Sequence, residues 1–325
     1  MPLPGEPFTS HQFGLHEGTV EALKIVHLPS GWLTAGDVDA AIAQSPGHAF
    51  NAADEIRFVA SLGCRLKVDA VVRLLCYANQ ASASSKRLTL DLTETPDVLG
   101  YINRILFFDR LALDVCVLPH RPERLGAMAY RGGNGGLVEI EPINREGCDP
   151  GLRQRLIVAV QQACSTRSDV RSLVEATRTT LSELVSNVGD HSETDLDGFA
   201  ALQVYRKRNN LVVTVADSGV GILRKLRPAL VAEVPALAEA GNVEILCEAI
   251  RRGVSSTGED GRGMGLKGSA QKAIKFRSTL DIRTERQGVI LFPSAGAYEP
   301  AKGMLYDNLP YLAGTHMTIT FSLAA

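Results

Sequence analysis

Residues 183–191 read Glu-Leu-Val-Ser-Asn-Val-Gly-Asp-His, and within this stretch Glu183, Asn187 and His191 recur at every fourth position. This spacing places a carboxylate, an amide and an imidazole on one face of a helix. A carboxylate one turn from an amide can deprotonate water while the amide oxygen helps to hold Mg²⁺. The alternative is a solvated face, because amphipathic helices carry such spacings by chance. An apolar stripe that would let the helix be buried beside this row consists of Leu181, Leu184, Val185 and Val188.

The chain has 325 residues, which is long enough for two domains. Its 45% hydrophobic and 22% charged residues are typical of a soluble globular protein. The net charge of −2 gives no electrostatic reason to expect nucleic acid or an anionic membrane as the main partner. No apolar run approaches the ~18 residues of a membrane span, and the first residues lack the pattern of a signal peptide. Six scattered cysteines without C-x-x-C spacing favour reduced thiols over a zinc site or disulfides, so we expect a cytoplasmic protein.

Composition divides the chain into four parts. Residues 1–20 are rich in Pro, Gly and His without periodicity and are expected to form a flexible arm. Residues 21–130 alternate strand and helix patterns, which predicts a small α/β module with a mixed or parallel sheet. A glycine-rich linker with one short strand, 131–148, precedes a second domain, 149–325. The elements expected in the module are strands 22–28, 87–92 and 113–118 and helices 68–78 and 98–108.

In the second domain an acidic residue follows a predicted strand. The strand 211–216 runs directly into Asp217-Ser218-Gly219-Val220-Gly221. The two glycines let the backbone turn tightly, so that the Asp217 carboxylate can point into a pocket. A carboxylate only accepts hydrogen bonds, which suits the exocyclic amine of adenine. An ordinary hairpin turn would account for the same short motif.

A second glycine-rich segment, residues 258–268, reads GEDGRGMGLKG and opens a helix expected at 265–276. Glycines let the backbone approach a polyphosphate, and the free N–H groups at a helix start bind it. The segment does not follow the order of a Rossmann site, and it lacks the G-K-[ST] of a P-loop. Other elements expected in this half are helices 151–164, 168–191, 228–240 and 243–252 and strands 199–205, 279–283, 289–292 and 315–323.

Taken in order, E-x-x-x-N-x-x-x-H on a helix, D-x-G-x-G at a strand end and G-x-G-x-G-L at a helix start match the three boxes of one superfamily. From about residue 150 to 325 the chain resembles the GHKL ATPases, named for gyrase, the heat-shock chaperone, histidine kinases and the mismatch-repair ATPase. Gly314-Thr315 before the last strand, and residues 253–257, which look like the end of an ATP lid, agree with this resemblance. The resemblance implies the Bergerat fold, a two-layer α/β sandwich with a mixed sheet and helices on one face.

The resemblance also implies roles for individual residues. Glu183 would be the general base, and Asn187 would be a ligand of Mg²⁺. Asp217 would accept a hydrogen bond from the adenine amine of ATP. His191 would either line the phosphate end of the site or cap the helix.

Further contacts to ATP are implied on both sides of the site. Arg262 and Lys267 would either add positive charge near the phosphates or remain solvated. The other implied contacts are Gly219, Gly221 and Thr315 at the adenine and Gly261, Gly263, Met264, Gly265 and Leu266 at the phosphates.

The N-terminal module is loosely similar to STAS domains, which bind partner proteins, in the segment LTLDLTETPDVLGYINRILFFDRL at 88–111. Residues 151–182 contain no histidine, so ordinary histidine autophosphorylation is not expected. The first hypothesis is an ATP-driven regulatory switch or serine protein kinase that acts on a partner protein, as in the anti-sigma-like kinases paired with STAS proteins. The alternatives are a slow ATPase whose hydrolysis resets a homodimer, and a nucleotide-binding module without turnover.

Overall fold

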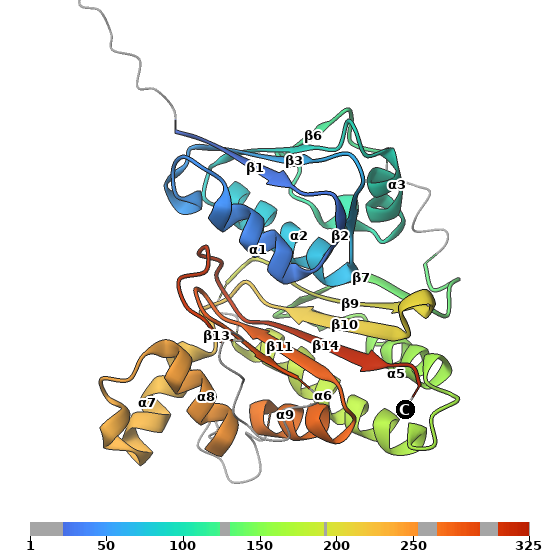
Figure 1. Cartoon of the computed structure of the whole chain (residues 1–325), viewed down its shortest axis with the longest axis vertical. Helices are drawn as coiled ribbons and strands as arrows, with labels where there is room; N and C mark the ends of the chain where they lie inside the picture. The colour runs from blue at the N-terminus through green and yellow to red at the C-terminus, as the bar shows by residue number, and fades with distance from the viewer. Residues whose placement is uncertain (1–21, 124–130, 192–193, 253–264, 293–304, 325) are drawn as a thin grey trace, which may run out of the picture.

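The structure is a computed structural model that describes residues 22–123, 131–191, 194–252, 265–292 and 305–324. Figure 1 shows four stacked layers in these residues: a sheet, a pair of helices, a second sheet and a second layer of helices. The expected arm, 1–20, and the expected end of the lid, 253–257, lie outside the described residues. No helix within the described ranges has the length and apolarity that a membrane span requires.

The N-terminal module is built on a parallel sheet. Its strands are β1 (Leu23–Leu28), β3 (Glu55–Ala60), β5 (Arg87–Asp91) and β6 (Cys116–Leu118), and they lie in that order. Helices α1 (Ala35–Gln44) and α2 (Val68–Ala83) cover one face of this sheet (Figure 1). A short parallel pair, β2 (Gly31–Leu33) and β4 (Cys64–Leu66), lies beside them.

The predicted strands 22–28 and 87–92 and the predicted helix 68–78 are confirmed as β1, β5 and α2. The predicted helix 98–108 is instead two helices, α3 (Pro96–Arg104) and α4 (Phe107–Arg110). The break falls at Leu106, whose φ of +69° cannot continue a right-handed helix.

Helix α2 is buried along most of its length because it lies between two sheets. Every residue from Val68 to Ala78 is buried, including the charged Asp69 and Arg73. A helix that is buried on all sides must pack against structure on all sides. Helix α2 packs on β5 of its own module and on two strands of the second sheet, β9 (Gly198–Tyr205) and β10 (Asn210–Ala216). The two halves of the chain therefore share a core around this helix.

The second sheet has eight strands in the order β13-β12-β11-β14-β10-β9-β7-β8. All of its described pairs are antiparallel, where a mixed sheet was expected. Short connections such as the turn at Asn209, with a φ of +52°, return β8, β10 and β12 beside the strand that precedes each of them and so give antiparallel pairing there. The segment 131–148 contributes two strands to the edge of this sheet. The strands not yet placed are β7 (Leu137–Asn144), β8 (Gly147–Cys148), β11 (Thr279–Arg283), β12 (Gly288–Leu291), β13 (Leu305–Tyr306) and β14 (His316–Ser322).

The domain's own helices cover one face of the second sheet, and α2 covers the other (Figure 1). On β10, Leu211, Val213 and Val215 belong to the core under the domain's helices, whereas Val212 and Ala216 belong to the core around α2. Because both faces are buried, the strand is apolar on both faces apart from Asn210 and Thr214, rather than alternating. The domain's helices are α5 (Leu152–Ala163), α6 (Val170–His191), α7 (Leu223–Glu233), α8 (Asn242–Arg252) and α9 (Gly265–Lys275).

Candidate functional site

Asp217 and Thr315 meet where β10 ends and β14 begins. The two strands are antiparallel, with Ala216 opposite His316, so the residues just outside this pair also face each other. Asp217 N donates to Thr315 O over 3.0 Å, and Thr315 N donates back to Asp217 Oδ2 over 3.0 Å. Gly219 N donates to Asp217 Oδ1 over 2.8 Å. Backbone N–H groups therefore fix both oxygens of this half-buried carboxylate, and a carboxylate oxygen can accept more than one hydrogen bond.

Glycines allow the close approaches on which this arrangement depends. Gly314 has a φ of +93°, and a Cβ there would stand 2.1 Å from Asp217 O. Gly221, in the turn after Asp217, has a φ of +72°. Both positions favour glycine, since an L-residue is strained at such angles.

Gly198 brings the end of α6 against the end of β10. A Cβ on Gly198 would stand 2.4 Å from Val188 Cγ1 and 2.6 Å from Ala216 O. Only glycine fits between these two elements, so Gly198 sets how closely the helix of Glu183 approaches the strand of Asp217. Nothing in the sequence singles out this residue, because a glycine before a strand carries no signal of close approach in a single sequence.

Glu183 lies half-buried on α6, next to the buried Leu184 and Val185. Burial raises the pKa of the Glu183 carboxyl above its ordinary value, and the nearby Lys272 on α9 opposes that rise. Burial likewise lowers the pKa of Lys272, and Glu183 opposes that shift. A carboxylate with a raised pKa is suited to accept a proton near neutral pH. Lys272 was also missed from the sequence, because nothing in its spacing indicates that α9 places it near α6.

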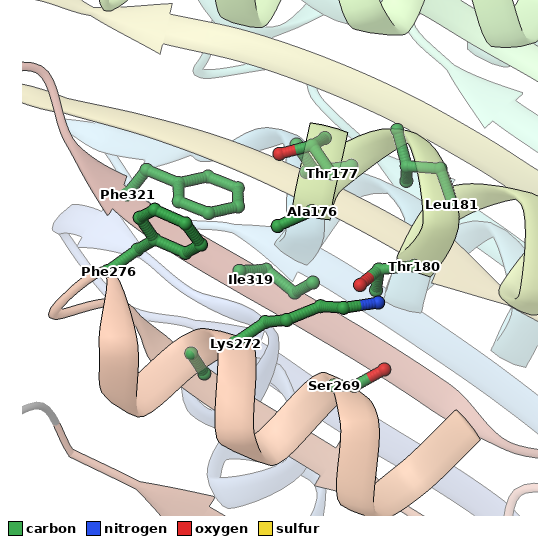
Figure 2. A pocket seen from close by; sticks show the side chains of 11 residues that line it. Ala176, Thr177, Thr180, Leu181, Ser269, Lys272, Phe276, Ile319 and Phe321 are labelled. Atoms are coloured by element: carbon green, nitrogen blue, oxygen red, sulfur yellow. The ribbon is translucent and has the colours of Figure 1, made fainter. Parts of the chain in front are cut away.

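Figure 2 shows a small, mostly apolar cavity between α6, α9 and the second sheet. The side chain of Lys272 runs along it with its amine toward Thr180, and Phe276, Ile319 and Phe321 form apolar walls. None of Glu183, Asp217 and Thr315 lines this cavity. It is therefore a gap in the packing beneath the helix pair, separate from the Asp217–Thr315 contact.

The structure locates the remaining predicted site residues only in part. Helix α9 begins at Gly265, where the glycine-rich segment predicted a helix start. Asn187 and His191 are in α6, but their side chains, with those of Leu266 and Lys267, lie outside the described part. The same holds for the whole of Gly261, Arg262, Gly263 and Met264. Among the described residues, no group of three or more His, Cys, Asp or Glu side chains could hold a metal ion, and all six cysteines have free thiols.

The profile of one family, described as Histidine kinase-, DNA gyrase B-, and HSP90-like ATPase, matches residues 174–324. The match includes the helix of Glu183, the turn after Asp217, the glycine-rich segment and the last strand. It begins after the N-terminal module, so the similarity of that module to STAS domains stays a prediction. A search of curated proteins finds no match to the chain. With its match over residues 174–324 and its antiparallel sheet backed by helices, the C-terminal half of this chain is an ATP-binding domain of the GHKL family.

Proposed function

We propose that the chain binds ATP with Mg²⁺ where α6, β10, α9 and β14 meet, and that it transfers the terminal phosphoryl group as part of a regulatory switch acting on a partner protein. In this proposal Asp217 binds the adenine, Glu183 is the general base, and the start of α9 faces the phosphates. The attachment of a second module directly to this domain favours a regulatory role, because that module shares a core with the sheet that carries the site.

The geometry of Asp217 carries the proposal. A carboxylate whose oxygens already accept from Gly219 N and Thr315 N is held in one orientation before a ligand arrives. The exocyclic amine of adenine can donate to such a group, whereas guanine has a carbonyl oxygen at the corresponding position, which the carboxylate would repel. The site is therefore expected to prefer ATP to GTP.

Glu183 has the environment of a general base. Its raised pKa strengthens its ability to take a proton from the attacking hydroxyl, whether of water or of a partner's side chain. Lys272 limits that rise in pKa by opposing the effect of burial. Asn187 lies one helical turn after Glu183 and would offer its amide oxygen to Mg²⁺. When bound, Mg²⁺ neutralises charge on the phosphates.

The test is to measure ATP binding and phosphate release for the wild type, Glu183→Gln and Asp217→Asn, each with Mg²⁺. Glu183→Gln should retain ATP binding and lose about 10²–10⁴-fold in turnover, which is the usual contribution of a general base. Asp217→Asn should weaken ATP binding, because the new amide nitrogen cannot accept from a backbone N–H. Glu175→Gln is the matched control, since Glu175 is an exposed residue on the same helix. A wild type that does not bind ATP would contradict the proposal.

Transfer to a partner and simple hydrolysis differ in where the terminal phosphate goes. A kinase-type switch should place labelled phosphate from ATP on a hydroxyl residue of a second protein, and Glu183→Gln should abolish the label. Label that appears only as free phosphate would make the chain a hydrolase. ATP binding with neither product would leave a binding module and would contradict the role of Glu183.

A further inference from the structure

Gln80, on α2 of the N-terminal module, forms a two-point contact with the segment that leads into Thr315. Gln80 Nε2 donates to Ala313 O over 3.0 Å, and Ala313 N donates to Gln80 Oε1 over 2.8 Å. The next residue, Gly314, packs directly on the backbone of Asp217, and Thr315 N holds the Asp217 carboxylate. Three consecutive residues therefore connect α2 to the adenine end of the proposed site.

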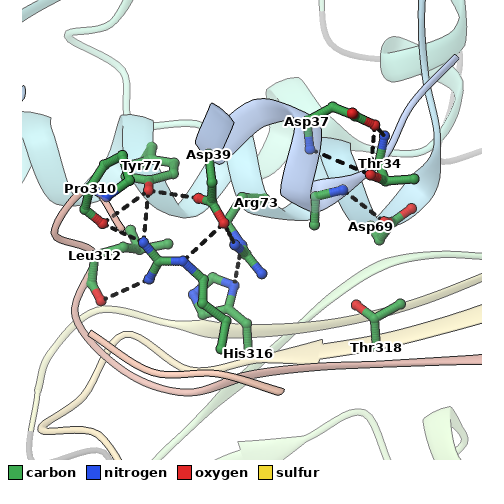
Figure 3. A network of polar contacts seen from close by, with 12 residues as sticks. Thr34, Asp37, Asp39, Asp69, Arg73, Tyr77, Pro310, Leu312, His316 and Thr318 are labelled. Carbon is green, nitrogen blue, oxygen red and sulfur yellow. Dashed lines mark hydrogen bonds and ion pairs between the residues drawn. The ribbon is translucent and has the colours of Figure 1, made fainter. Parts of the chain in front are cut away.

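The rest of this segment is held by side chains and by two backbone hydrogen bonds, Leu309 N to Arg286 O over 2.7 Å and Leu312 N to Glu285 O over 3.1 Å. Residues 307–315 have no regular secondary structure. The Tyr77 hydroxyl of α2 donates to Asp39 Oδ1 over 2.8 Å and accepts from Arg283 Nη2 over 2.9 Å. Arg283 of β11 also donates to Pro310 O and, over 3.4 Å, to Leu312 O. Buried backbone groups need such partners, so these side chains contribute to the conformation of the segment together with its backbone hydrogen bonds. Figure 3 shows Tyr77, Pro310 and Leu312 in this cluster.

Buried charges join the cluster to the N-terminal module. Asp39 of α1 accepts from Arg73 of α2 and, over 3.1 Å, from Arg283 Nε. Arg73 Nε also donates to His316 Nδ1 of β14 over 3.2 Å (Figure 3). The side chains of Asp39, Arg73 and Arg283 are at most 4% exposed. Because breaking a buried ion pair is costly, α1, α2 and the start of β14 are expected to move as one body.

We propose that Gln80 is a positioning residue for the nucleotide site, and that α2 and the bound nucleotide are therefore coupled. Gln80 sets the position of Ala313-Gly314-Thr315, and this segment sets the position of the Asp217 carboxylate. Anything that displaces α2 then weakens nucleotide binding, and by reciprocity bound nucleotide strengthens the hold of the segment on α2. This inference rests on the proposed role of Asp217 at adenine, and it assigns regulation of that site to the N-terminal module.

The neighbouring residue provides a matched control. Asn79 makes the same kind of two-point contact within the N-terminal module: its Nδ2 donates to Arg110 O over 2.9 Å, and Ala112 N donates to its Oδ1 over 2.9 Å. Asn79→Ala and Gln80→Ala thus each remove two amide hydrogen bonds from the same turn of α2. Only Gln80→Ala releases the segment that reaches Asp217.

The experiment measures dissociation constants for ATP and GTP in the full chain for the wild type, Gln80→Ala, Asn79→Ala and Asp217→Asn. Each hydrogen bond of this kind contributes about a threefold to tenfold factor, so loss of both in Gln80→Ala should weaken ATP binding by about tenfold to a hundredfold and reduce the preference for ATP over GTP. Asn79→Ala should leave both unchanged. If Gln80→Ala does not fold, Gln80→Met serves in its place, because it keeps the length of the side chain and lacks both hydrogen-bonding groups.

The outcomes separate this inference from the proposed function. Equal ATP binding by Gln80→Ala and Asn79→Ala, with weakened binding by Asp217→Asn, would overturn the role of Gln80 and leave the site intact. Equal weakening of ATP and GTP binding by Gln80→Ala would also overturn it, because a purely structural role does not change base preference. Absence of ATP binding by the wild type would refute the site itself.

Discussion

Alanine at Gly314 tests the contact between the last strand and Asp217. Its φ is +93°, and a Cβ there would stand 2.1 Å from Asp217 O and 2.6 Å from Asp217 Oδ1. An L-residue at such an angle costs about 1–3 kcal/mol. Relieving the clash adds a further ~1–3 kcal/mol, the usual cost of overpacking. We therefore expect Gly314→Ala to lower the free energy of unfolding by about 2–6 kcal/mol and to displace the Asp217 carboxylate from its backbone donors.

Two other glycines separate these contributions. Gly31 has a φ of +100° with nothing within 4 Å of its Cβ position, so Gly31→Ala carries the backbone cost alone. Gly241 is exposed, with no neighbour within 4 Å and no positive φ, but it is the N-cap of α8, so Gly241→Ala should cost only about 0.5–1 kcal/mol. Urea denaturation can be followed by the fluorescence of Trp32, the single tryptophan. Its ring packs edge-on against Tyr205 of β9, so it reports the contact between the module and the second sheet.

The expected order of stability is Gly241→Ala, then Gly31→Ala, then Gly314→Ala. Equal losses in Gly31→Ala and Gly314→Ala would refute the close approach of Gly314 to Asp217. ATP affinity should fall in Gly314→Ala and stay unchanged in Gly31→Ala. Unchanged affinity in folded Gly314→Ala would mean that Asp217 does not bind the adenine.

Three further predictions concern buried charges. Arg283→Met should lower the free energy of unfolding by about 3–5 kcal/mol, because it removes a donor from the buried Asp39 carboxylate and from four backbone carbonyls. Arg286 is exposed and lies over the ring of Tyr311, so Arg286→Met should cost under ~1 kcal/mol in the same urea titration. Equal losses of stability in Arg283→Met and Arg286→Met would contradict the buried network. Because burial raises the pKa of Glu183, the acid limb of the pH–rate profile for phosphate release should lie above the ordinary range of a glutamate. Lys272→Met should move this limb to still higher pH, since Lys272 lowers that pKa, and an unmoved limb would exclude their interaction. Burial, with nearby arginines, lowers the pKa of His316 well below its usual value. At pH below about 6.5 the His316 imidazole is then protonated in the unfolded chain but stays neutral in the folded one, so the free energy of unfolding should fall by up to ~1.4 kcal/mol per pH unit. His316→Asn should remove this pH-dependent component.

Several features of the fold and the site could be predicted from the sequence because their signals are local. The spacing from Glu183 to His191 indicates a helix face, and α6 contains it. The glycines after Asp217 indicate a tight turn, and Gly221 has the positive φ that such a turn needs. A helix start at Gly265 and a last strand after Thr315 were predicted in the same way and are confirmed as α9 and β14.

The layer of α2 over the second sheet could not be predicted in the same way. Strand 211–216 is apolar on both faces, which indicates that something covers each face, but not which segment does so. The segment 131–148 was predicted to be a glycine-rich linker with one short strand, and that strand is β7, but its pairing with β9 could not be predicted. Strand pairing depends on a partner elsewhere in the chain, so composition alone does not reveal it.

The sequence by itself determined the chemical groups of the site and the elements that carry them, because helical spacing and glycine turns act over a few residues. The tertiary structure decided which of these groups meet. Gln80 and Ala313 are 233 positions apart, and Asp39 and Arg283 are 244 apart. Contacts over such separations depend on how the two halves pack around α2, and no local spacing encodes that packing. The connection between the N-terminal module and Asp217 therefore exists only in the folded chain.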